Sequence, residues 1–275
     1  MSVSGRSERP AKRPDGHDWR VAGDAWGHAA DDWSTLFEHY AIDVVSAIAR
    51  RVGAGPATRL LDVACGSGWT MRYLRALGAD VAGIDAARRL LDVAAERNPA
   101  SELVHGSMFD LPWTAGSFDA VVAINGIWGG GDAALHEAHR VLRPGGMIGL
   151  SFWGSGEPLD LRPFFFAVAG HLDRDHVAGM VSINDIATPG VAEDMLGAAG
   201  FEVVERGRRV SVLEWPDEDV AWRALRSVGP IVPALRDSDP DIVRRDALGA
   251  IEHCRTARGT YRFQNVQDFV VARRS

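Results

Sequence analysis

The chain carries a glycine-rich turn followed by a lone acid, residue types that suit a nucleotide-like ligand. Residues 60–63 form an apolar run interrupted by Asp62, and Ala64-Cys65-Gly66-Ser67-Gly68 follow it directly. A second apolar run, residues 80–84, ends in Asp85. Glycines let a backbone approach a ligand closely, and a carboxylate accepts hydrogen bonds from ribose hydroxyls. The pattern therefore predicts a site for a cofactor that contains adenosine.

Two residues near this turn argue against a nicotinamide cofactor. Dinucleotide-binding folds place Gly or Ala three residues after the second glycine so that the helix packs closely on the strand, but Met71 stands there in this chain. Asp62 also ends a strand that those folds usually keep apolar at this point. An NAD-dependent oxidoreductase is therefore disfavoured and is kept only as an alternative.

Composition argues against several other classes of protein. The chain has 275 residues and a net charge of −7, which is the wrong sign for binding a nucleic-acid backbone. Its two cysteines, Cys65 and Cys254, lie far apart, which favours a reduced, cytoplasmic protein without a metal centre. The only lysine is Lys12, so lysine-based chemistry is disfavoured. No signal peptide or membrane-spanning run is recognisable.

Strand and helix patterns alternate after a Gly/Pro break at residues 53–56. We expect strands over residues 59–64, 80–84, 102–105, 118–124 and 147–152, with helices over residues 69–77, 87–96 and 133–142. Arg143-Pro144-Gly145-Gly146 is expected to close the last of these helices. The alternation predicts an α/β fold with a parallel sheet and helices on both faces. Further helices (190–199, 218–228, 241–254) and strands (201–215, 261–273) are expected beyond it.

Two segments outside the alternating strands and helices are expected to cover the ligand-binding edge of the sheet. Residues 1–18 are polar and are expected to be a disordered tail, whereas residues 19–275 are expected to form one domain. Within it, residues 19–52 are predicted to be a helical cover, since Trp19, Trp26 and Trp33 recur every seventh residue along a helix over residues 19–51. Residues 153–188, with three consecutive phenylalanines, are predicted to be an insert that roofs a second ligand site or packs on the sheet.

Five motifs in order resemble those of class I S-adenosylmethionine (SAM) dependent methyltransferases, closest to the type-11 group of ubiquinone and menaquinone biosynthesis. They lie at residues 61–68, 83–85, 106–112, 117–122 and 140–146. The resemblance is strong over residues 60–152 and weaker around Trp26 and in the last strand. It implies a Rossmann-like, seven-stranded, mostly parallel sheet with an antiparallel last strand, and SAM bound across the carboxyl ends of the strands.

The resemblance also implies roles for single residues. Asp62 would fix the turn and the amino-acid end of SAM, and Asp85 would bind the ribose. Ser107 stands where the family often has Asp, which implies a weaker contact with adenine. The implied cofactor-binding set is Asp62, Ala64, Cys65, Gly66, Gly68, Asp85, Ala86, Ser107, Met108, Phe109, Asn125 and Gly126. Plainer interpretations stay open: Asp62 as a turn cap, Asp85 as a surface acid and Cys65 as a small turn residue.

Aromatic residues outside the motifs are the candidates for holding the methyl acceptor: Trp26, Trp33, Trp128, Phe152, Trp153 and Phe165. The tryptophan stripe can equally face the core. Methyl transfer needs positioning more than covalent help, so no catalytic residue is assigned. His28, His39 and His171 are candidate bases, and each can instead be structural.

These observations predict a cytoplasmic SAM-dependent methyltransferase that releases S-adenosylhomocysteine. Its acceptor is expected to be a small, apolar or aromatic molecule of specialised metabolism. We expect a monomer or homodimer with no nucleic-acid, membrane or metal partner. The alternative is a SAM-binding methyltransferase fold repurposed as a cyclase or as a scaffold that does not methylate.

Overall fold

The computed structural model describes residues 18–275, except for the side chain of Ile183. The predicted tail, residues 1–18, lies outside the described residues apart from Asp18, as does Lys12. The carboxylate of Asp18 accepts a 3.0 Å hydrogen bond from the Arg20 backbone N–H and caps the first helix. Helix α1 (Trp19–Gly27) therefore begins where the sequence predicts.

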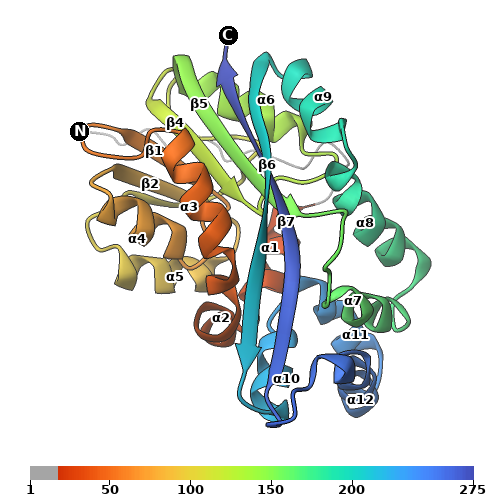
Figure 1. The fold of residues 1–275 in the computed structure, drawn as a ribbon. Helices are drawn as coiled ribbons and strands as arrows, with labels where there is room; N and C mark the ends of the chain where they lie inside the picture. Colours follow the sequence, from red (N-terminus) through yellow and green to blue (C-terminus); the bar gives the residue numbers. More distant parts are fainter. Residues whose placement is uncertain (1–17) are drawn as a thin grey trace, which may run out of the picture.

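Seven strands form one sheet in the order β3-β2-β1-β4-β5-β7-β6 (Figure 1). The first five pair in parallel, and β7 runs antiparallel to both of its neighbours, β5 and β6. This confirms the predicted Rossmann-like sheet with an antiparallel last strand. The strands are β1 (Arg59–Val63), β2 (Asp80–Asp85), β3 (Leu103–His105), β4 (Phe118–Ile124), β5 (Leu142–Trp153), β6 (Phe201–Trp215) and β7 (Tyr261–Arg274).

Helices cover both faces of the sheet, as its alternating strands and helices predict. Successive residues of β1 point to opposite faces, so Leu60 joins the core under α3, α4 and α5 while Leu61 joins the core under α6 and α9. Both leucines are fully buried, which is typical of strands in a doubly covered parallel sheet. The helices are α3 (Ile42–Arg51), α4 (Trp69–Ala76), α5 (Arg88–Arg97), α6 (Asp132–Val141) and α9 (Val191–Ala198).

The segment after α6 differs from the prediction. The structure ends α6 at Val141 and starts β5 at Leu142, five residues before the predicted strand. Phe118 pairs with Leu142, and the register then shifts before Ala120 pairs with Met147. Gly145 has a φ of 75°, a conformation that few other residues adopt. The turn residues are therefore an irregular stretch inside the strand.

The N-terminal cover is not the single helix that the sequence predicts. After α1 the chain forms α2 (Ala30–Asp32), a π-helical turn η1 (Trp33–Phe37) and a 3₁₀ turn η2 (Glu38–Ala41) before α3. A Cβ atom on Gly23 would lie 2.1 Å from the carbonyl oxygen of Ala86, so the backbone of α1 rests directly on the end of β2. The changes of helical pitch place both Glu38 and Tyr40 on the inner side of this cover.

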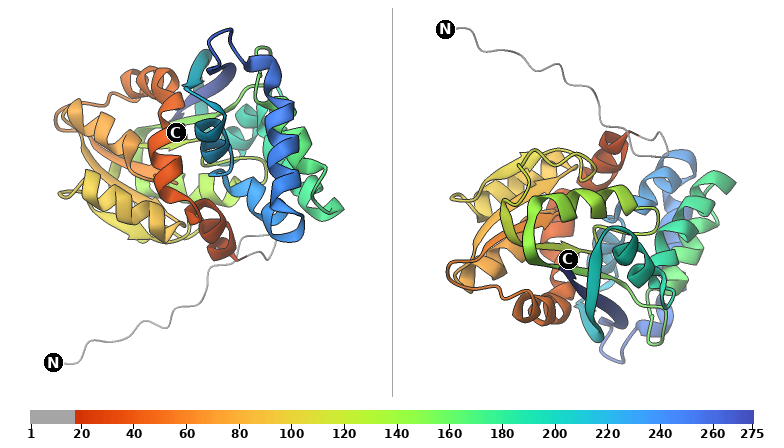
Figure 2. Two further views of the ribbon diagram at one scale, coloured as in Figure 1. Left: turned by 90° about the horizontal axis from the view of Figure 1, so that it is seen from below. Right: turned by 90° about the horizontal axis from the view of Figure 1, so that it is seen from above.

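Helices from distant parts of the chain gather beyond the carboxyl ends of the strands. Figure 1 shows α7, α10, α11 and α12 at the lower end of the molecule, where β6 and β7 extend past the other strands. In the view from below, the green α7 and the blue α12 lie side by side (Figure 2). None of the described helices is long and apolar enough to cross a membrane. The elements of this cap are α7 (Arg162–Ala169), α8 (Arg174–Asn184), η3 (Asp185–Ala187), α10 (Glu218–Leu225), η4 (Gly229–Ile231), α11 (Val232–Asp237), α12 (Pro240–Ala250) and η5 (Glu252–Cys254).

Candidate functional site

A cavity of about 780 Å³ lies between the carboxyl ends of the strands and the helices that cap them. Its size is within the range of small-molecule sites. Every predicted cofactor-binding residue except Gly68 lines it, and so does every predicted acceptor residue except Phe152. Motifs that are far apart in the sequence thus meet in one place because parallel strands end at the same edge of the sheet.

Strained backbone marks the strand ends that face the cavity. Ala64 follows β1 with a φ of 58°, and Asn125 follows β4 with a φ of 52°. Residues other than glycine rarely adopt this left-handed conformation, and such strain concentrates at functional sites. Gly66 has a φ of 54°, and a Cβ built on it would meet nothing within 4 Å. The turn after β1 therefore presents bare backbone to open space, as a ligand cradle requires.

Gly68 does not line the cavity, which corrects its predicted role. A Cβ on this residue would lie 2.5 Å from the side-chain nitrogen of Asn98, which donates a 3.0 Å hydrogen bond to the Gly68 carbonyl. Gly68 has a φ of 73° and directly precedes α4. The positive φ and the close packing on α5 explain why this residue is a glycine. A contact between Gly68 and a ligand is not needed as an explanation.

Asp85 is a buried residue that holds the turn backbone through hydrogen bonds, and it is not a surface acid. Its Oδ2 accepts a 2.7 Å hydrogen bond from the Gly66 backbone N–H, and its Oδ1 accepts one of 2.7 Å from Ala87. Burial raises the pKa of this carboxyl, and the two backbone hydrogen bonds oppose that rise. Because each carboxylate oxygen has two lone pairs, Asp85 can still accept hydrogen bonds from the cavity side.

Two further buried acids lie at the same end of the cavity. Burial raises the pKa of Asp62 well above its ordinary value, and the nearby Asp85 adds to the rise. Its Oδ2 has no hydrogen-bond partner among the described residues. Glu38 was not predicted; it accepts hydrogen bonds from Ser67 and Arg97, while burial raises its pKa. Arg97 balances the charge of Glu38, whereas Asp62 and Asp85 have no such partner among the described residues, so a cationic ligand would favour their ionised forms.

A slot beside the acids is lined by Ser107, Met108 and Phe109, as predicted for the adenine end. The Phe109 backbone N–H donates a 3.2 Å hydrogen bond to the Ser107 hydroxyl, which fixes the turn that follows β3. Met108 and Phe109 are half-buried, so part of each side chain is free for contact with a flat ring.

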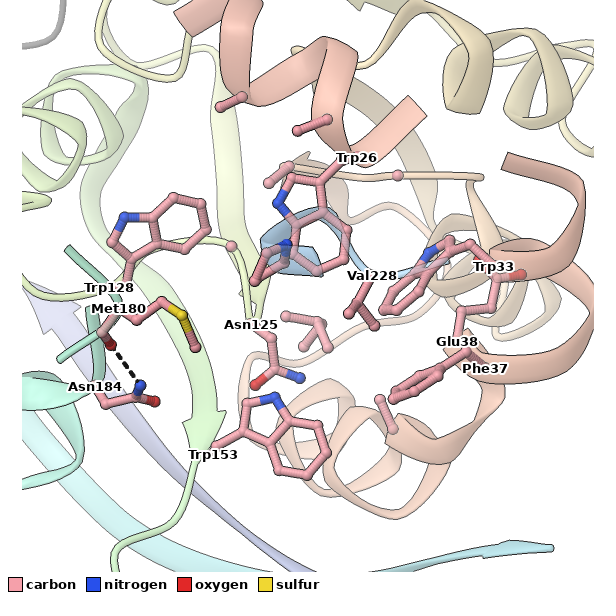
Figure 3. A pocket seen from close by; sticks show the side chains of 18 of the residues that line it. Trp26, Trp33, Phe37, Glu38, Asn125, Trp128, Trp153, Met180, Asn184 and Val228 are labelled. Atoms are coloured by element: carbon pink, nitrogen blue, oxygen red, sulfur yellow. Dashed lines mark hydrogen bonds between the residues drawn. The ribbon is translucent and has the colours of Figure 1, made fainter. Parts of the chain in front are cut away.

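Aromatic side chains dominate the other end of the cavity. Trp153 stacks on Tyr40 with ring centres 5.2 Å apart and meets Phe165 edge-on at 6.2 Å. The Asn125 side chain donates a 2.7 Å hydrogen bond to the Tyr40 hydroxyl. Burial raises the pKa of Tyr40, so it remains a hydrogen-bond donor at neutral pH. Figure 3 shows Asn125 between Trp26 and Trp153, with Trp128 and Met180 on one side.

The tryptophans of the N-terminal cover serve the core and the cavity together. Trp26 and Trp33 meet edge-on at 5.0 Å, and Trp33 stacks on Phe37 at the same distance. Both tryptophans also pack against a small apolar cluster that contains Leu90. All three members of the stripe, Trp19 included, line the cavity. The stripe therefore packs on the core and also faces the cavity, and its contact with an acceptor stays a prediction.

Phe152 is a correction to the predicted acceptor set. Its side chain is only 4% exposed and belongs to the core on the opposite face of the sheet, beneath the guanidinium of Arg206 at 5.6 Å. The reason is the two-residue period of a strand, which sends Phe152 and Trp153 to opposite faces. Only Trp153 can face the cavity.

None of the three candidate histidine bases lines the cavity. The two ring nitrogens of His28 contact the carbonyl oxygens of Ala25 and Arg226, each at 2.7 Å. His39 is exposed, because the 3₁₀ turn that directs its neighbours inward directs it outward. His171 pairs with Asp246 at 3.0 Å behind the cap helices. The structure therefore supports the structural interpretation of all three.

Neither cysteine has the lowered thiol pKa of a nucleophile. Cys65 lines the cavity, but burial raises the pKa of its thiol well above the ordinary value, and Asp85 adds to the rise. Cys254 lies with His253 and Asp160 in a small group of potential metal ligands within residues 18–275 that does not line the cavity. Burial raises the pKa of Cys254 to about 12, so it is a protonated thiol.

Comparison with known proteins agrees with this geometry. Residues 61–150 match the family model described as a methyltransferase domain. A demethylmenaquinone methyltransferase of Staphylococcus aureus is 38% identical over 109 residues, which is 37% of this chain. That match covers 45% of the relative, so it reaches less than half of its length.

Solved structures of low sequence identity share the fold. The [4+2]-cyclase SpnF is 18% identical with a TM-score of 0.58, and the match covers 99% of both chains. A phosphoethanolamine N-methyltransferase of Haemonchus contortus, solved with phosphomonomethylethanolamine and S-adenosylhomocysteine, is 17% identical with a TM-score of 0.57. That match covers 94% of this chain and 59% of the other. Residues 61–150 therefore match a methyltransferase domain, and the likeness to these solved structures shows that the chain shares their fold.

Proposed function

We propose that the protein transfers a methyl group from SAM to a small, largely apolar or aromatic molecule. The observation that carries this proposal is that the two ends of the cavity at the strand ends are lined by residues of different chemistry. One end has buried acids and bare turn backbone, and the other is walled by aromatic side chains. A cationic cofactor and an apolar acceptor would each find the surroundings that suit it.

The chain's own residues fit SAM at the acidic end. Asp85 would accept hydrogen bonds from the ribose, and Asp62, whose Oδ2 lacks a partner among the described residues, would balance the ammonium group. Gly66 leaves room where any side chain would intrude, and Met108 and Phe109 would flank the adenine. When bound, SAM supplies a methyl group on a positively charged sulfur, which needs no covalent activation by the protein.

The protein's contribution at the other end would be positioning and exclusion of water. Trp153, stacked on Tyr40, would hold a flat or apolar acceptor, and the Tyr40 hydroxyl would donate to an acceptor oxygen. In the part of the chain that the structure describes, no histidine or lysine lines the cavity. The proposed acceptor is therefore one whose attacking atom loses its proton readily or carries none, such as an acidic phenol or an activated carbon.

Two measurements test the proposal in sequence. Isothermal titration calorimetry with SAM should show binding, and the absence of binding would overturn the proposal. Incubation with a panel of phenols, enols and related apolar molecules should then yield S-adenosylhomocysteine. Conversion of a substrate with SAM left intact would instead favour the cyclase alternative, for which the SpnF-like fold gives precedent. Binding of NAD(H) in place of SAM would revive the oxidoreductase.

A further inference from the structure

The outer end of the cavity is formed by apolar side chains that the protein leaves in water. Phe166 on α7 is 71% exposed and Val181 on α8 is 62% exposed, and both line the cavity. Scattered exposed apolar residues need no explanation, but two that flank the mouth of a cavity from facing helices are candidates for a ligand contact. We call Phe166, Ala169, Val177 and Val181 the apolar mouth.

The side chains of helix α8 that the structure describes are all exposed or half-buried. It has 11 residues, and none whose side chain is described is buried. Isolated helices this short are marginal in water, so most draw their stability from an apolar face packed on the protein. Its cavity-lining residues are spaced as one helical stripe, Val177, Met180, Val181 and Asn184. This stripe faces open space where a core would be expected.

Helix α7, on the other side of the mouth, is a fixed wall. Phe164 and Val168 are each 1% exposed and anchor α7 in the core, where it packs against α12. Phe165 and Phe166 line the cavity, and Phe165 also meets the Phe164 ring edge-on with ring centres 5.1 Å apart. A ligand in the mouth would therefore be held between a helix anchored in the core and a helix with no buried residue among those whose side chains are described.

We propose that the apolar mouth binds an apolar extension of the acceptor, such as an alkyl, acyl or prenyl chain. This rests on the proposed function and deepens it: the acceptor is an elongated molecule. Its reactive end lies beside Asn125 and Trp153, and its extension leaves the interior between Phe166 and Val181. Burying that chain would cover side chains of α8 that are exposed or half-buried.

Other occupants of the mouth are less well supported by the structure. The residues of the mouth line the same cavity as Trp153, so a ligand reaches them from within. The chain's net charge of −7 opposes attraction to an anionic membrane surface. Two exposed apolar side chains also fall far short of the roughly 800 Å² per partner of a stable dimer.

The test uses a series of 4-alkylphenols, from ethyl to nonyl, titrated into the full chain saturated with S-adenosylhomocysteine. Affinity should rise about two- to fourfold with each added methylene until the chain emerges into water. Val181→Asp and Phe166→Asp should flatten this dependence while leaving the affinity for ethylphenol within about twofold. Val21→Asp is the matched control, because Val21 is also helical and 69% exposed but does not line the cavity.

The outcomes separate this inference from the proposed function. If S-adenosylhomocysteine does not bind, the proposed function fails. If it binds but affinity is flat along the series in the wild type, only the apolar mouth is overturned. A Val181-dependent dimer in analytical ultracentrifugation, or Val181-dependent sedimentation with phosphatidylcholine vesicles, would assign the patch to another occupant and would also overturn it.

Discussion

The two ends of the cavity are built in opposite ways. At the acidic end, Asp85 holds the turn through two backbone hydrogen bonds of 2.7 Å, and Arg97 joins Glu38 to the same turn. At the aromatic end, Trp153 stacks on Tyr40 at 5.2 Å and meets Phe165 edge-on at 6.2 Å, and α8 has no buried residue among those whose side chains are described. One end is fixed by polar contacts to strand ends, and the other is closed by packed aromatic rings and by a helix whose described side chains are exposed or half-buried.

This difference in construction matches the different ligands proposed for the two ends. A cofactor that is common to a family can be held by rigid backbone at the sheet edge, because its shape does not change. The acceptor differs between enzymes, and its site is built from an insert and from cap helices that can vary without disturbing the sheet. The following variants would break or sharpen that contrast, beginning with the largest expected effect.

Replacing Asp85 tests the rigid end most directly. Asp85→Ala removes the acceptor for Gly66 and Ala87 and the proposed ribose contact, so SAM affinity should fall at least about tenfold. Calorimetric titration measures the loss. Asp80→Ala is the control, because Asp80 begins the same strand and its side chain is 78% exposed. An Asp85→Ala variant that is folded and binds SAM normally would show that the ribose lies elsewhere.

Two glycine variants test how tightly α8 is held in place by its contact with Gly129. A Cβ on Gly129 would lie 2.1 Å from the carbonyl oxygen of Ser182, so Gly129→Ala should push the end of α8 outward. We expect roughly fivefold weaker binding of a long alkylphenol and faster proteolysis near residues 170–185, with SAM affinity unchanged.

Gly179→Ala is the counterpart within α8 itself. A Cβ there would meet nothing within 4 Å, and Ala favours a helix over Gly by about 1 kcal/mol. Proteolysis near α8 should therefore become slower. Equal protection in the two variants would mean that α8 is not the loosely held element described above.

Removing one hydroxyl tests the polar contact within the aromatic end. Tyr40→Phe keeps the stack on Trp153 but leaves the Asn125 side chain without its 2.7 Å partner. A hydrogen bond is worth about 1 kcal/mol, so turnover of a phenolic acceptor should fall roughly fivefold. SAM affinity should stay within twofold. Tyr73→Phe, at a half-buried tyrosine outside the cavity, should change neither quantity.

The buried acids predict how pH affects the two ligands. Burial raises the pKa values of Asp62, Asp85 and Glu38, so these groups take up protons at a higher pH than ordinary carboxyls. Protonation removes their attraction for the sulfonium charge. Between about pH 7.5 and about pH 5, SAM affinity should fall a few-fold, and S-adenosylhomocysteine, which lacks that charge, should lose less. Identical profiles for the two ligands would argue against an electrostatic role for the acids.

The raised pKa values of these carboxyls also make folding stability depend on pH. Lower pH weakens SAM binding but favours the folded state. A carboxyl whose pKa is higher in the folded state favours folding most at low pH, below its pKa in the unfolded chain. That contribution is lost as pH rises through the folded-state value. Differential scanning fluorimetry should therefore show a larger gain in melting temperature from SAM at neutral than at acidic pH, because the bound cation offsets the ionised acids.

The sequence by itself determined the sheet and the acidic end of the cavity. Period-two apolar runs, the glycine turn and Asp62 and Asp85 are local signals, and parallel strands necessarily bring their carboxyl ends together. Local sequence patterns did not predict the roles of Glu38 and Gly68. Glu38 faces inward only because the helix changes pitch between Trp33 and Ala41, and Gly68 is used for packing on α5.

Only the tertiary structure decided which aromatic residues meet an acceptor. Phe152 and Trp153 are equally apolar neighbours in the sequence, and their place in the sheet sends one to the core and the other to the cavity. The stripe on α8 has the spacing of an ordinary core-facing helix, yet it faces the cavity. Period and composition show that a side chain will be covered, but what covers it depends on contacts between segments far apart in the chain.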